Sequence, residues 1–288
     1  MITKGIILAG GTGSRLNPLT QVINKQLLPL YDKPLIFYPL SSLMLANIRN
    51  ILVISNKGSS KIFKKLLGNG TRYGLNITYK EQNKPTGIPE AFTIGKKFIK
   101  NDNVALILGD NFFYGKGLGF TLENSKKFTS GCKIFLKDVK KPENYGVAKI
   151  VNGKINKITE KPKKFISSKA ITGLYFFDNE VIRLVKKLKP SKRGETEIVD
   201  VIKYYKAINK LTFEEIGRGS IWSDVGKIED LHNVSNYVAS IEHLQGIKIA
   251  CLEEIALQKK WVDKNIIKKT AKIYKNSPYS NYLKKILD

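Results

Sequence analysis

A glycine-rich segment near the start of the chain, followed by two basic residues, has the composition of a phosphate-binding site. Residues 5–16 read Gly-Ile-Ile-Leu-Ala-Gly-Gly-Thr-Gly-Ser-Arg-Leu, and a lysine stands at position 25. Glycines after an apolar run allow a tight turn whose N–H groups can approach phosphate oxygens. The guanidinium of Arg15 adds a charged fork that fits phosphate, and Lys25 adds a second positive charge. The Walker pattern would need a Gly-Lys-Ser/Thr ending and the Rossmann fingerprint a third glycine, and this segment has neither.

Two aspartates and a further lysine could complete such a site. Asp110 follows an apolar run, Asp224 lies within Trp-Ser-Asp-Val-Gly, and Lys161 precedes a proline. Carboxylate oxygens are the hard ligands that Mg²⁺ prefers, and a lysine adds positive charge beside phosphate. Taken alone, each residue also fits a structural role, the basic ones as solvated surface charges and the aspartates as capping or turn residues.

The elements around these residues alternate between strands and helices. Short apolar runs predict strands, and helical spacing of apolar positions predicts the segments between them. This order is typical of a doubly wound, mostly parallel α/β sheet of the Rossmann-like kind, which binds ligands at the carboxyl ends of its strands. The expected strands are Ile6–Ala9, Ile51–Ser55, Ile77–Tyr79 and Ala105–Leu108, and the expected helices are Pro39–Ala46, Ser59–Leu67 and Pro89–Ile99.

The second half predicts a small β elaboration and then helices. Asn152-Gly153 supplies the positive φ angles of a type I′ turn and predicts a hairpin. No linker rich in Gly, Ser or Pro divides the chain, so we expect one domain over 1–288, with an α/β core over 1–226 and a helical region over 227–288. The expected elements are the hairpin strands Val147–Val151 and Lys154–Ile158, the strands Thr172–Phe177 and Leu211–Ile216, and helical segments at Leu252–Leu257, Trp261–Ile267 and Tyr279–Leu287.

Composition excludes several other classes of protein. The net charge of +26 comes almost entirely from scattered lysines, whereas base readout and stacking favour arginine, so we expect no nucleic-acid partner. No apolar run approaches the roughly 20 residues of a membrane span, and no signal-peptide pattern is present, so we expect a cytoplasmic protein without a membrane partner. Cys132 and Cys251 lack metal-ligand spacing and are expected to be buried thiols. His232 and His243 are expected on helix surfaces or in packing.

The glycine segment is the first of a collinear series of motifs. Lys25-Gln-Leu-Leu-Pro-Leu-Tyr-Asp-Lys-Pro34 comes next. The series continues with Leu108-Gly-Asp-Asn111, Tyr145-Gly-Val147, Glu160-Lys-Pro162, Thr172-Gly-Leu-Tyr-Phe176, Arg193-Gly-Glu-Thr-Glu197, Trp222-Ser-Asp-Val-Gly226 and Gln245-Gly-Ile-Lys248. In this order the motifs resemble the sugar nucleotidylyltransferases, and most closely the short bacterial glucose-1-phosphate thymidylyltransferases.

The resemblance implies a reaction, a cofactor and roles for the charged residues. Members transfer dTMP from dTTP to α-D-glucose 1-phosphate with Mg²⁺, giving dTDP-glucose and pyrophosphate, the first step towards dTDP-L-rhamnose and other deoxysugars. By resemblance, Arg15 and Lys25 hold the triphosphate and Lys161 holds the sugar phosphate. Asp110, which also contacts the nucleotide, and Asp224 hold the metal.

Further contacts are implied on both substrates. Those to the nucleotide come from Leu8, Gly10, Gly11, Thr12, Gly13, Gln26, Gln82 and Gly87. Those to the sugar come from Asn111, Tyr145, Gly146, Glu160, Ile171 and Tyr175. Glu160 also suits this role chemically, because a carboxylate accepts hydrogen bonds from sugar hydroxyls.

Five positions depart from the family pattern, and two of them are Ile88 and Ser223, each of which replaces Leu. Pro89 replaces Ala beside the expected base contacts, which leaves the choice of nucleobase open. Val225 replaces Thr but leaves the neighbouring aspartate in place. Ile171 replaces Val and narrows the sugar side by one methylene, a difference worth about 1–3 kcal/mol at most.

Alternatives to this function remain in the sequence. The same chemistry could use UTP or another sugar 1-phosphate. A binding protein without turnover would be expected to have lost a charged site residue, and none is lost. No hexapeptide repeat follows residue 230, so no β-helix of the kind found in longer relatives is expected. Family members are homotetramers, often with a second nucleotide-sugar site at a subunit contact, and Trp261, Ile266 and Tyr282 could serve that contact or pack within the chain.

Overall fold

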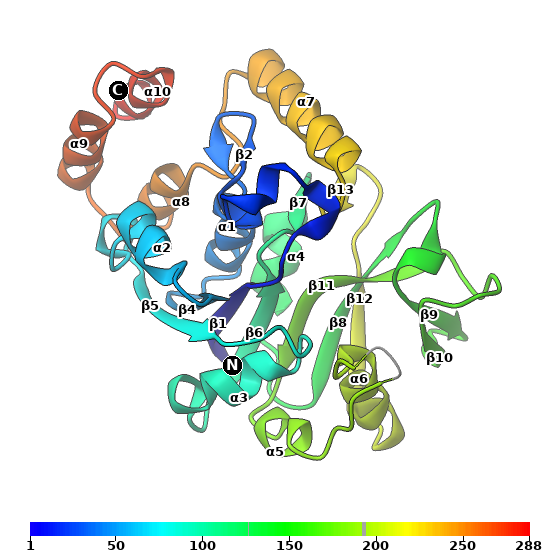
Figure 1. The fold of residues 1–288 in the computed structure, drawn as a ribbon. Helices are drawn as coiled ribbons and strands as arrows, with labels where there is room; N and C mark the ends of the chain where they lie inside the picture. Colours follow the sequence, from blue (N-terminus) through cyan, green and yellow to red (C-terminus); the bar gives the residue numbers. More distant parts are fainter. Residues whose placement is uncertain (126, 192–193) are drawn as a thin grey trace.

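The computed structural model describes residues 1–125, 127–191 and 194–288 and is built around one large sheet (Figure 1). Four adjacent strands of this sheet are parallel and follow the order β5-β4-β1-β6. They comprise β1 (Ile2–Ala9), β4 (Asn50–Asn56), β5 (Asn76–Gln82) and β6 (Asn103–Leu108). Each contains one of the strands predicted in the first half of the chain.

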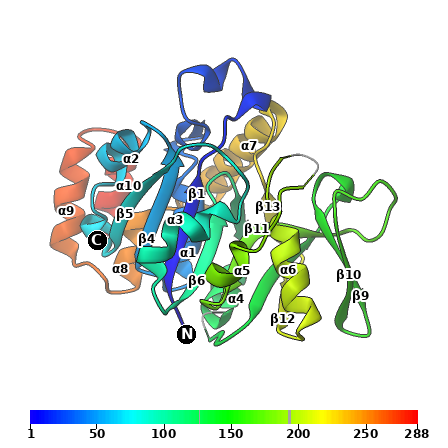
Figure 2. The ribbon, with the colours of Figure 1, turned by 60° about the horizontal axis from the view of Figure 1, so that its bottom comes forward.

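The chain reverses its direction across the sheet between β1 and β6. Helices α1 (Phe37–Leu45) and α2 (Ser60–Leu67) carry the chain from β1 to β5 on one face. Helix α3 (Glu90–Ile99) returns it on the opposite face to β6, on the other side of β1 (Figure 2). Such a reversal leaves a crevice at the carboxyl ends of the two strands, where open α/β sheets bind ligands. The glycine segment follows β1 and Asp110 follows β6, so both lie at this crevice.

Strand side chains alternate between two hydrophobic cores, one on each face of the sheet. On β6, Ala105 and Ile107 belong to the first core, while Val104 and Leu106 belong to the second. Burial on both faces is why this strand is a continuous apolar run. The first core also contains α4 (Leu118–Ser125), and the second contains α5 (Val181–Val185) and α6 (Ile198–Ala207). The predicted doubly wound α/β fold is confirmed.

The other strands extend the sheet or form small pairs beside it. Strand β11 runs antiparallel to β6 and β8. The predicted hairpin is present as β9–β10, and its turn residues Asn152 and Gly153 have φ angles of 50° and 71°. Strands β2, β3, β7, β8 and β13 lie outside the predicted set. The bounds are β8 (Cys132–Asp138), β9 (Gly146–Val151), β10 (Lys154–Glu160), β11 (Lys169–Phe177), β12 (Leu211–Glu215), and the pairs β7 (Phe112–Gly115) with β13 (Ser220–Ser223) and β2 (Pro29–Leu30) with β3 (Lys33–Pro34).

Four helices follow the last strand. They are α7 (Ile228–Gln245), α8 (Leu252–Gln258), α9 (Lys264–Ile273) and α10 (Pro278–Lys285). Helices α8, α9 and α10 lie beside α1 and α2, and Trp261, Ile266 and Tyr282 are partly buried against the first core. In the part of the chain that the structure describes, no helix combines the length and the apolar character of a membrane span. Both cysteines are buried and both histidines are exposed, as predicted.

Candidate active site

The glycine segment leaves the carboxyl end of β1 and is held by side chains from the two neighbouring strands. Asn56, at the end of β4, accepts a hydrogen bond from the N–H of Gly11 at 3.0 Å and donates one to the carbonyl of the same residue at 2.7 Å. Gln82, at the end of β5, donates to Oδ1 of Asn56 at 3.3 Å. The Gln82 amide also lies so close to Gly10 that a Cβ atom there would come within 1.9 Å of it. Glycine at position 10 therefore leaves the room that the Gln82 amide occupies in this arrangement.

A short turn places Lys25 and Gln26 beneath the glycine segment. The side chain of Asn24 accepts from the N–H of Gln26 at 3.0 Å and donates to the carbonyl of Ala9 at 3.2 Å. Lys25 and Gln26 are only 7% and 2% exposed. Within the described residues, Oε1 of Gln26 is buried and has no hydrogen-bond partner. The turn thus directs one positive charge and one free acceptor toward the crevice.

Two aspartates from distant parts of the chain lie around the amine of Lys25. The Nζ of Lys25 donates to Oδ2 of Asp110 at 2.7 Å and to the backbone carbonyl of Asp224 at 3.5 Å. Burial and the negative charge of Asp110 raise the pKa of the Asp224 carboxyl, against the opposing charges of Lys25 and Arg15. Two carboxylates that disfavour each other's charge are stabilised by a cation between them. We call these three residues, Lys25, Asp110 and Asp224, the site cluster.

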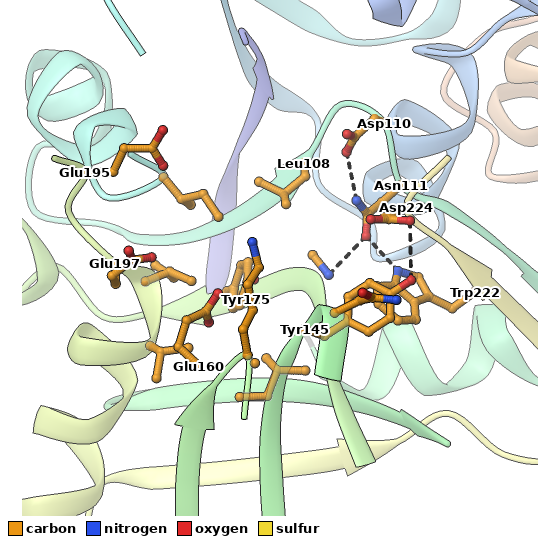
Figure 3. Close-up of a pocket in the computed structure, with 18 of the residues that line it drawn as sticks. Leu108, Asp110, Asn111, Tyr145, Glu160, Tyr175, Glu195, Glu197, Trp222 and Asp224 are labelled. Atoms are coloured by element: carbon orange, nitrogen blue, oxygen red, sulfur yellow. Dashed lines mark hydrogen bonds between the residues drawn. The ribbon is translucent and has the colours of Figure 1, made fainter. Parts of the chain in front are cut away.

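Asn111 fixes the position of Asp110. The Asn111 side chain is fully buried, and its Nδ2 donates to Oδ1 of Asp110 at 2.9 Å (Figure 3). Its Oδ1 accepts from the N–H of Gly173 at 3.0 Å and from Nε1 of Trp222 at 2.6 Å. A Cβ atom on Gly173 would lie 2.5 Å from this amide, so only glycine leaves room for it. Trp222, for which the sequence predicted no role, therefore orients Asn111 and, through it, Asp110.

Tyr145 and Lys161 approach from the antiparallel part of the sheet. The hydroxyl of Tyr145 donates to Oδ1 of Asp224 at 3.5 Å, and burial together with Asp224 raises the pKa of Tyr145, so the hydroxyl keeps its proton. The N–H of Lys161 donates to the carbonyl of Tyr145 at 3.0 Å. Lys161 has φ of 42° and Val225, next to Asp224, has φ of 38°. Left-handed backbone is strained for residues other than glycine, and most of all for a β-branched residue such as Val225.

Two pockets meet at Arg15 and Asp110. The glycine-side pocket, of about 340 Å³, is lined by Leu8, Gly10, Gly11, Arg15, Gln26, Gln82, Pro85, Gly87, Ile88, Leu108, Asp110 and Glu195. The hairpin-side pocket, of about 260 Å³, is shown in Figure 3 and shares Arg15, Ile88, Leu108, Asp110 and Glu195 with the first. Its other lining residues are Asn111, Asn144, Tyr145, Gly146, Glu160, Lys161, Ile171, Gly173, Tyr175, Thr196, Glu197, Ile198, Val199, Trp222 and Asp224.

The structure brings together most of the residues that the sequence predicted for each substrate. All six predicted only for the sugar, together with Lys161, line the hairpin-side pocket. Those predicted for the nucleotide line the glycine-side pocket, with three exceptions: Thr12 and Gly13 do not line it, and Lys25 reaches it through Asp110. These positions agree with the predicted roles but do not test them.

Several pocket residues had no predicted role. Glu195, Glu197 and Trp222 were visible in the sequence only as parts of motifs, and Arg193 of the same motif lies outside the described residues. Asn56 carried no motif signal, although its place after an apolar run marks the end of a strand. Its contacts with Gly11 depend on the pairing of β1 with β4.

Comparison with known proteins gives concordant matches. A family model described as "Nucleotidyl transferase" matches residues 4–241. The chain is 46% identical over 285 residues to a glucose-1-phosphate thymidylyltransferase of Neisseria meningitidis serogroup A, covering 99% of both chains. It is 46% identical over 286 residues to one of Mycolicibacterium smegmatis, again covering 99% of both. Among solved structures, a candidate glucose-1-phosphate thymidylyltransferase of Bacillus anthracis in complex with sucrose superposes with a TM-score of 0.75 at 40% identity, covering 81% of this chain and 94% of that one.

Proposed function

The chain belongs to the nucleotidyl transferase family, beside its glucose-1-phosphate thymidylyltransferases, and from that premise we propose that it joins dTTP and α-D-glucose 1-phosphate into dTDP-glucose. A phosphate oxygen of the sugar phosphate attacks the α-phosphorus of dTTP and forms a new P–O bond. The bond from the α-phosphorus to the bridging oxygen breaks, and pyrophosphate leaves with the electron pair. Atoms and charge balance without any further reactant.

The observation that carries this proposal is the junction of the two pockets. The glycine-side pocket offers glycines and a guanidinium for a triphosphate, and the hairpin-side pocket offers Glu160 and Lys161 for a sugar phosphate. The pockets share Arg15 and Asp110, so a phosphate oxygen from one would meet a phosphorus atom from the other beside the site cluster. Holding both reactants in one geometry supplies much of the rate enhancement in such transfers.

Each basic residue of the site has a different phosphate group to bind. Arg15 borders both pockets, where its fork can hold the triphosphate and stabilise charge that develops on the leaving pyrophosphate. Lys25, buried and already bonded to Asp110, adds positive charge beneath the α-phosphate. Lys161, whose backbone is fixed to Tyr145, can hold the sugar phosphate for in-line attack.

The site cluster fits a divalent cation of the Mg²⁺ type. Asp110 and Asp224 offer hard oxygen ligands, and burial together with the neighbouring charge of Asp110 raises the pKa of Asp224, a cost that a bound cation would reduce. Within the described ranges, no group of three or more His, Cys, Asp or Glu side chains could hold a metal. Two carboxylates suffice for Mg²⁺, which takes its remaining ligands from water and substrate phosphates. When bound, the ion would neutralise phosphate charge during the transfer.

The same chemistry with UTP or another sugar 1-phosphate is the alternative. Pro89 immediately precedes α3, and its neighbour Ile88 lines both pockets, so the chain differs from the family pattern at the place where a base would lie. The family also leads us to propose a homotetramer with a second nucleotide-sugar site, a cytoplasmic location, and a product that feeds the synthesis of dTDP-linked deoxysugars such as dTDP-L-rhamnose.

One assay tests the proposal. Pyrophosphate release is measured with each of dTTP, UTP, dCTP and ATP against glucose 1-phosphate and galactose 1-phosphate, with Mg²⁺ and with excess EDTA. We expect the highest kcat/KM for dTTP with glucose 1-phosphate and no turnover in EDTA. No release with any pair contradicts the enzyme assignment, whereas a preference for UTP or galactose 1-phosphate contradicts only the substrate assignment.

A further inference from the structure

Asn56 joins the two parts of the glycine-side pocket that a nucleotide would contact. It is the last residue of β4 and the register partner of Gln82, the last residue of β5. Its Nδ2 donates to the carbonyl of Gly11 at 2.7 Å, and its Oδ1 accepts both from the N–H of Gly11 at 3.0 Å and from Nε2 of Gln82 at 3.3 Å. One side-chain amide therefore connects the glycine segment with the glutamine beside it.

The backbone of Gly11 determines which way both amides face. An N–H can only donate and a carbonyl can only accept, so Asn56 must present Oδ1 to the first and Nδ2 to the second. The same Oδ1 faces Gln82, and an oxygen requires a donor, so Gln82 must turn Nε2 toward Asn56. The usual ambiguity between the oxygen and the nitrogen of an amide is thus removed for both residues.

This orientation decides what Gln82 offers to the pocket. Gln82 is 4% exposed, lies against Gly10 and lines the glycine-side pocket with Leu8 and Gly87. Among the described residues no hydrogen bond reaches its Oε1, while Nε2 keeps a second N–H. The side chain therefore presents an acceptor next to a donor.

This pair of groups distinguishes between pyrimidine bases. Thymine and uracil carry a ring N–H beside a carbonyl, which is a donor next to an acceptor and complements the Gln82 amide. Cytosine has an unprotonated ring nitrogen at that position, which would oppose Oε1 with a lone pair. A buried acceptor facing another acceptor is left unsatisfied, and this is how a site rejects the wrong ligand.

We propose that Asn56 is a positioning residue that holds the glycine segment and orients Gln82, so that the site selects nucleotides whose base has a ring N–H beside a carbonyl. The inference rests on the proposed function, because it takes the glycine-side pocket as the nucleotide site. Asn56 acts through Gly11 and Gln82 and needs no contact with the nucleotide.

Equilibrium binding of dTTP and dCTP by isothermal titration calorimetry, with pyrophosphate-release kinetics alongside, tests this role in Asn56→Ala. We expect dTTP affinity to fall about tenfold and the preference for dTTP over dCTP to shrink about tenfold, since each reflects about one lost or misdirected hydrogen bond. The KM for glucose 1-phosphate should stay within about twofold of wild type. The matched control is Asn76→Ala. Asn76 bonds Asn50 at 3.3 Å at the other end of the same two strands, and this variant should change none of these quantities.

Asn56→Asp separates the two roles of the residue, which are to hold the glycine segment and to orient Gln82. Because this substitution is nearly isosteric, it tests the inference even if Asn56→Ala does not fold. Its carboxylate still offers an oxygen to Gln82 but cannot donate to the carbonyl of Gly11. We expect weaker binding of both nucleotides with the preference for dTTP retained. An unchanged preference in a folded Asn56→Ala, or a lost preference in Asn56→Asp, overturns the inference. If wild type binds dTTP but releases no pyrophosphate, the proposed reaction fails and the binding ratios still decide the role of Asn56; binding of neither nucleotide overturns both.

Discussion

Two clusters of buried charge in this chain differ in their balance. In the site cluster, two aspartates share the single amine of Lys25, which bonds the carboxylate of Asp110 and the backbone carbonyl of Asp224. A second group, which we call the core cluster, consists of Asp32, Lys33, Glu242 and Lys248. It pairs two carboxylates with two amines: Lys33 bonds Asp32 and Glu242, and Lys248 bonds the same two acids.

The core cluster is stabilised by a backbone hydrogen bond and an aromatic ring as well as by its ion pairs. Glu242 accepts a further hydrogen bond from the N–H of Ile249 at 2.8 Å, and the amines of Lys33 and Lys248 lie over the ring of Tyr279 at 5.8 and 5.9 Å. Burial alone would raise the pKa of Asp32, but Lys33 and Lys248 outweigh it and lower that pKa. The pKa of Asp224 in the site cluster moves in the opposite direction.

The number of partners per charge thus distinguishes buried ions that stabilise the fold from buried ions that are suited to bind a ligand. Balanced, hydrogen-bonded ions join α7 to β3 and to the turn before it. A carboxylate that is desolvated at the junction of two pockets and lies beside a second carboxylate is costly to the folded state, and an added cation would relieve that cost. Substitutions in the two clusters should therefore have opposite consequences.

The largest expected effect is on turnover in Asp224→Asn. The amide keeps the shape and the Tyr145 contact but removes one negative ligand, so Mg²⁺-dependent pyrophosphate release should fall about 10²–10³-fold with the fold intact. Asp102→Asn is the matched control, because Asp102 precedes β6 at the end remote from Asp110 and pairs with Lys4 at the surface. Turnover in Asp224→Asn equal to that of the control would remove Asp224 from the metal site.

The next effect is on stability in Glu242→Gln. Removal of this charge leaves two buried amines with one carboxylate, and we expect the free energy of unfolding in urea to drop by about 3 kcal/mol. The KM for both substrates should not change. Glu180→Gln, in an exposed pair with Arg183, serves as control and should shift stability by no more than about 0.5 kcal/mol. Equal effects of the two substitutions would contradict the role of the core cluster.

A smaller effect depends on pH and concerns Asp32. Because its folded pKa lies below the ordinary value of 3.8, its ionised form stabilises the fold above that value, and this contribution is lost as the pH falls through the folded pKa. The difference in unfolding free energy between wild type and Asp32→Asn should be largest at pH 6–7, on the order of 1 kcal/mol, and should shrink on acidification. Denaturant titrations of both proteins at several pH values measure this difference. If the difference grows as the pH falls, the folded pKa of Asp32 is raised rather than lowered, and the prediction is wrong.

The smallest expected effect is the change in the free energy of unfolding caused by Asp224→Asn. Loss of a carboxylate that is disfavoured by burial and by Asp110 should leave the free energy of unfolding unchanged or raise it by up to about 1 kcal/mol in the absence of metal. The urea titration used for Glu242→Gln measures it in EDTA. A clear loss of stability would mean that Asp224, like the acids of the core cluster, stabilises the fold, and the contrast between the two clusters would be wrong.

Local rules explain how much of the fold was predictable. Strands β1, β4, β5 and β6 and helices α1, α2 and α3 follow from apolar periodicity, and the β9–β10 hairpin follows from Asn152-Gly153, whose φ angles are both positive as expected. Strands β7 and β13 have four residues each, too few for a periodic pattern to stand out. Strand β8 begins with a buried cysteine and ends with an exposed aspartate, and it is recognisable chiefly through its partners β11 and β12.

The candidate site divides in the same way. The sequence determined the glycine segment, the charged residues and the strand ends that carry them, because residue type and local spacing depend only on neighbours in the chain. Tertiary structure alone placed Asp224 beside Asp110, put Trp222 on Asn111 and set Asn56 between Gly11 and Gln82. Tertiary structure also decided that Lys33 has two carboxylates as partners, whereas the Asp224 carboxylate lies beside another carboxylate. The energy of a buried charge depends on partners that only folding brings within a few ångströms.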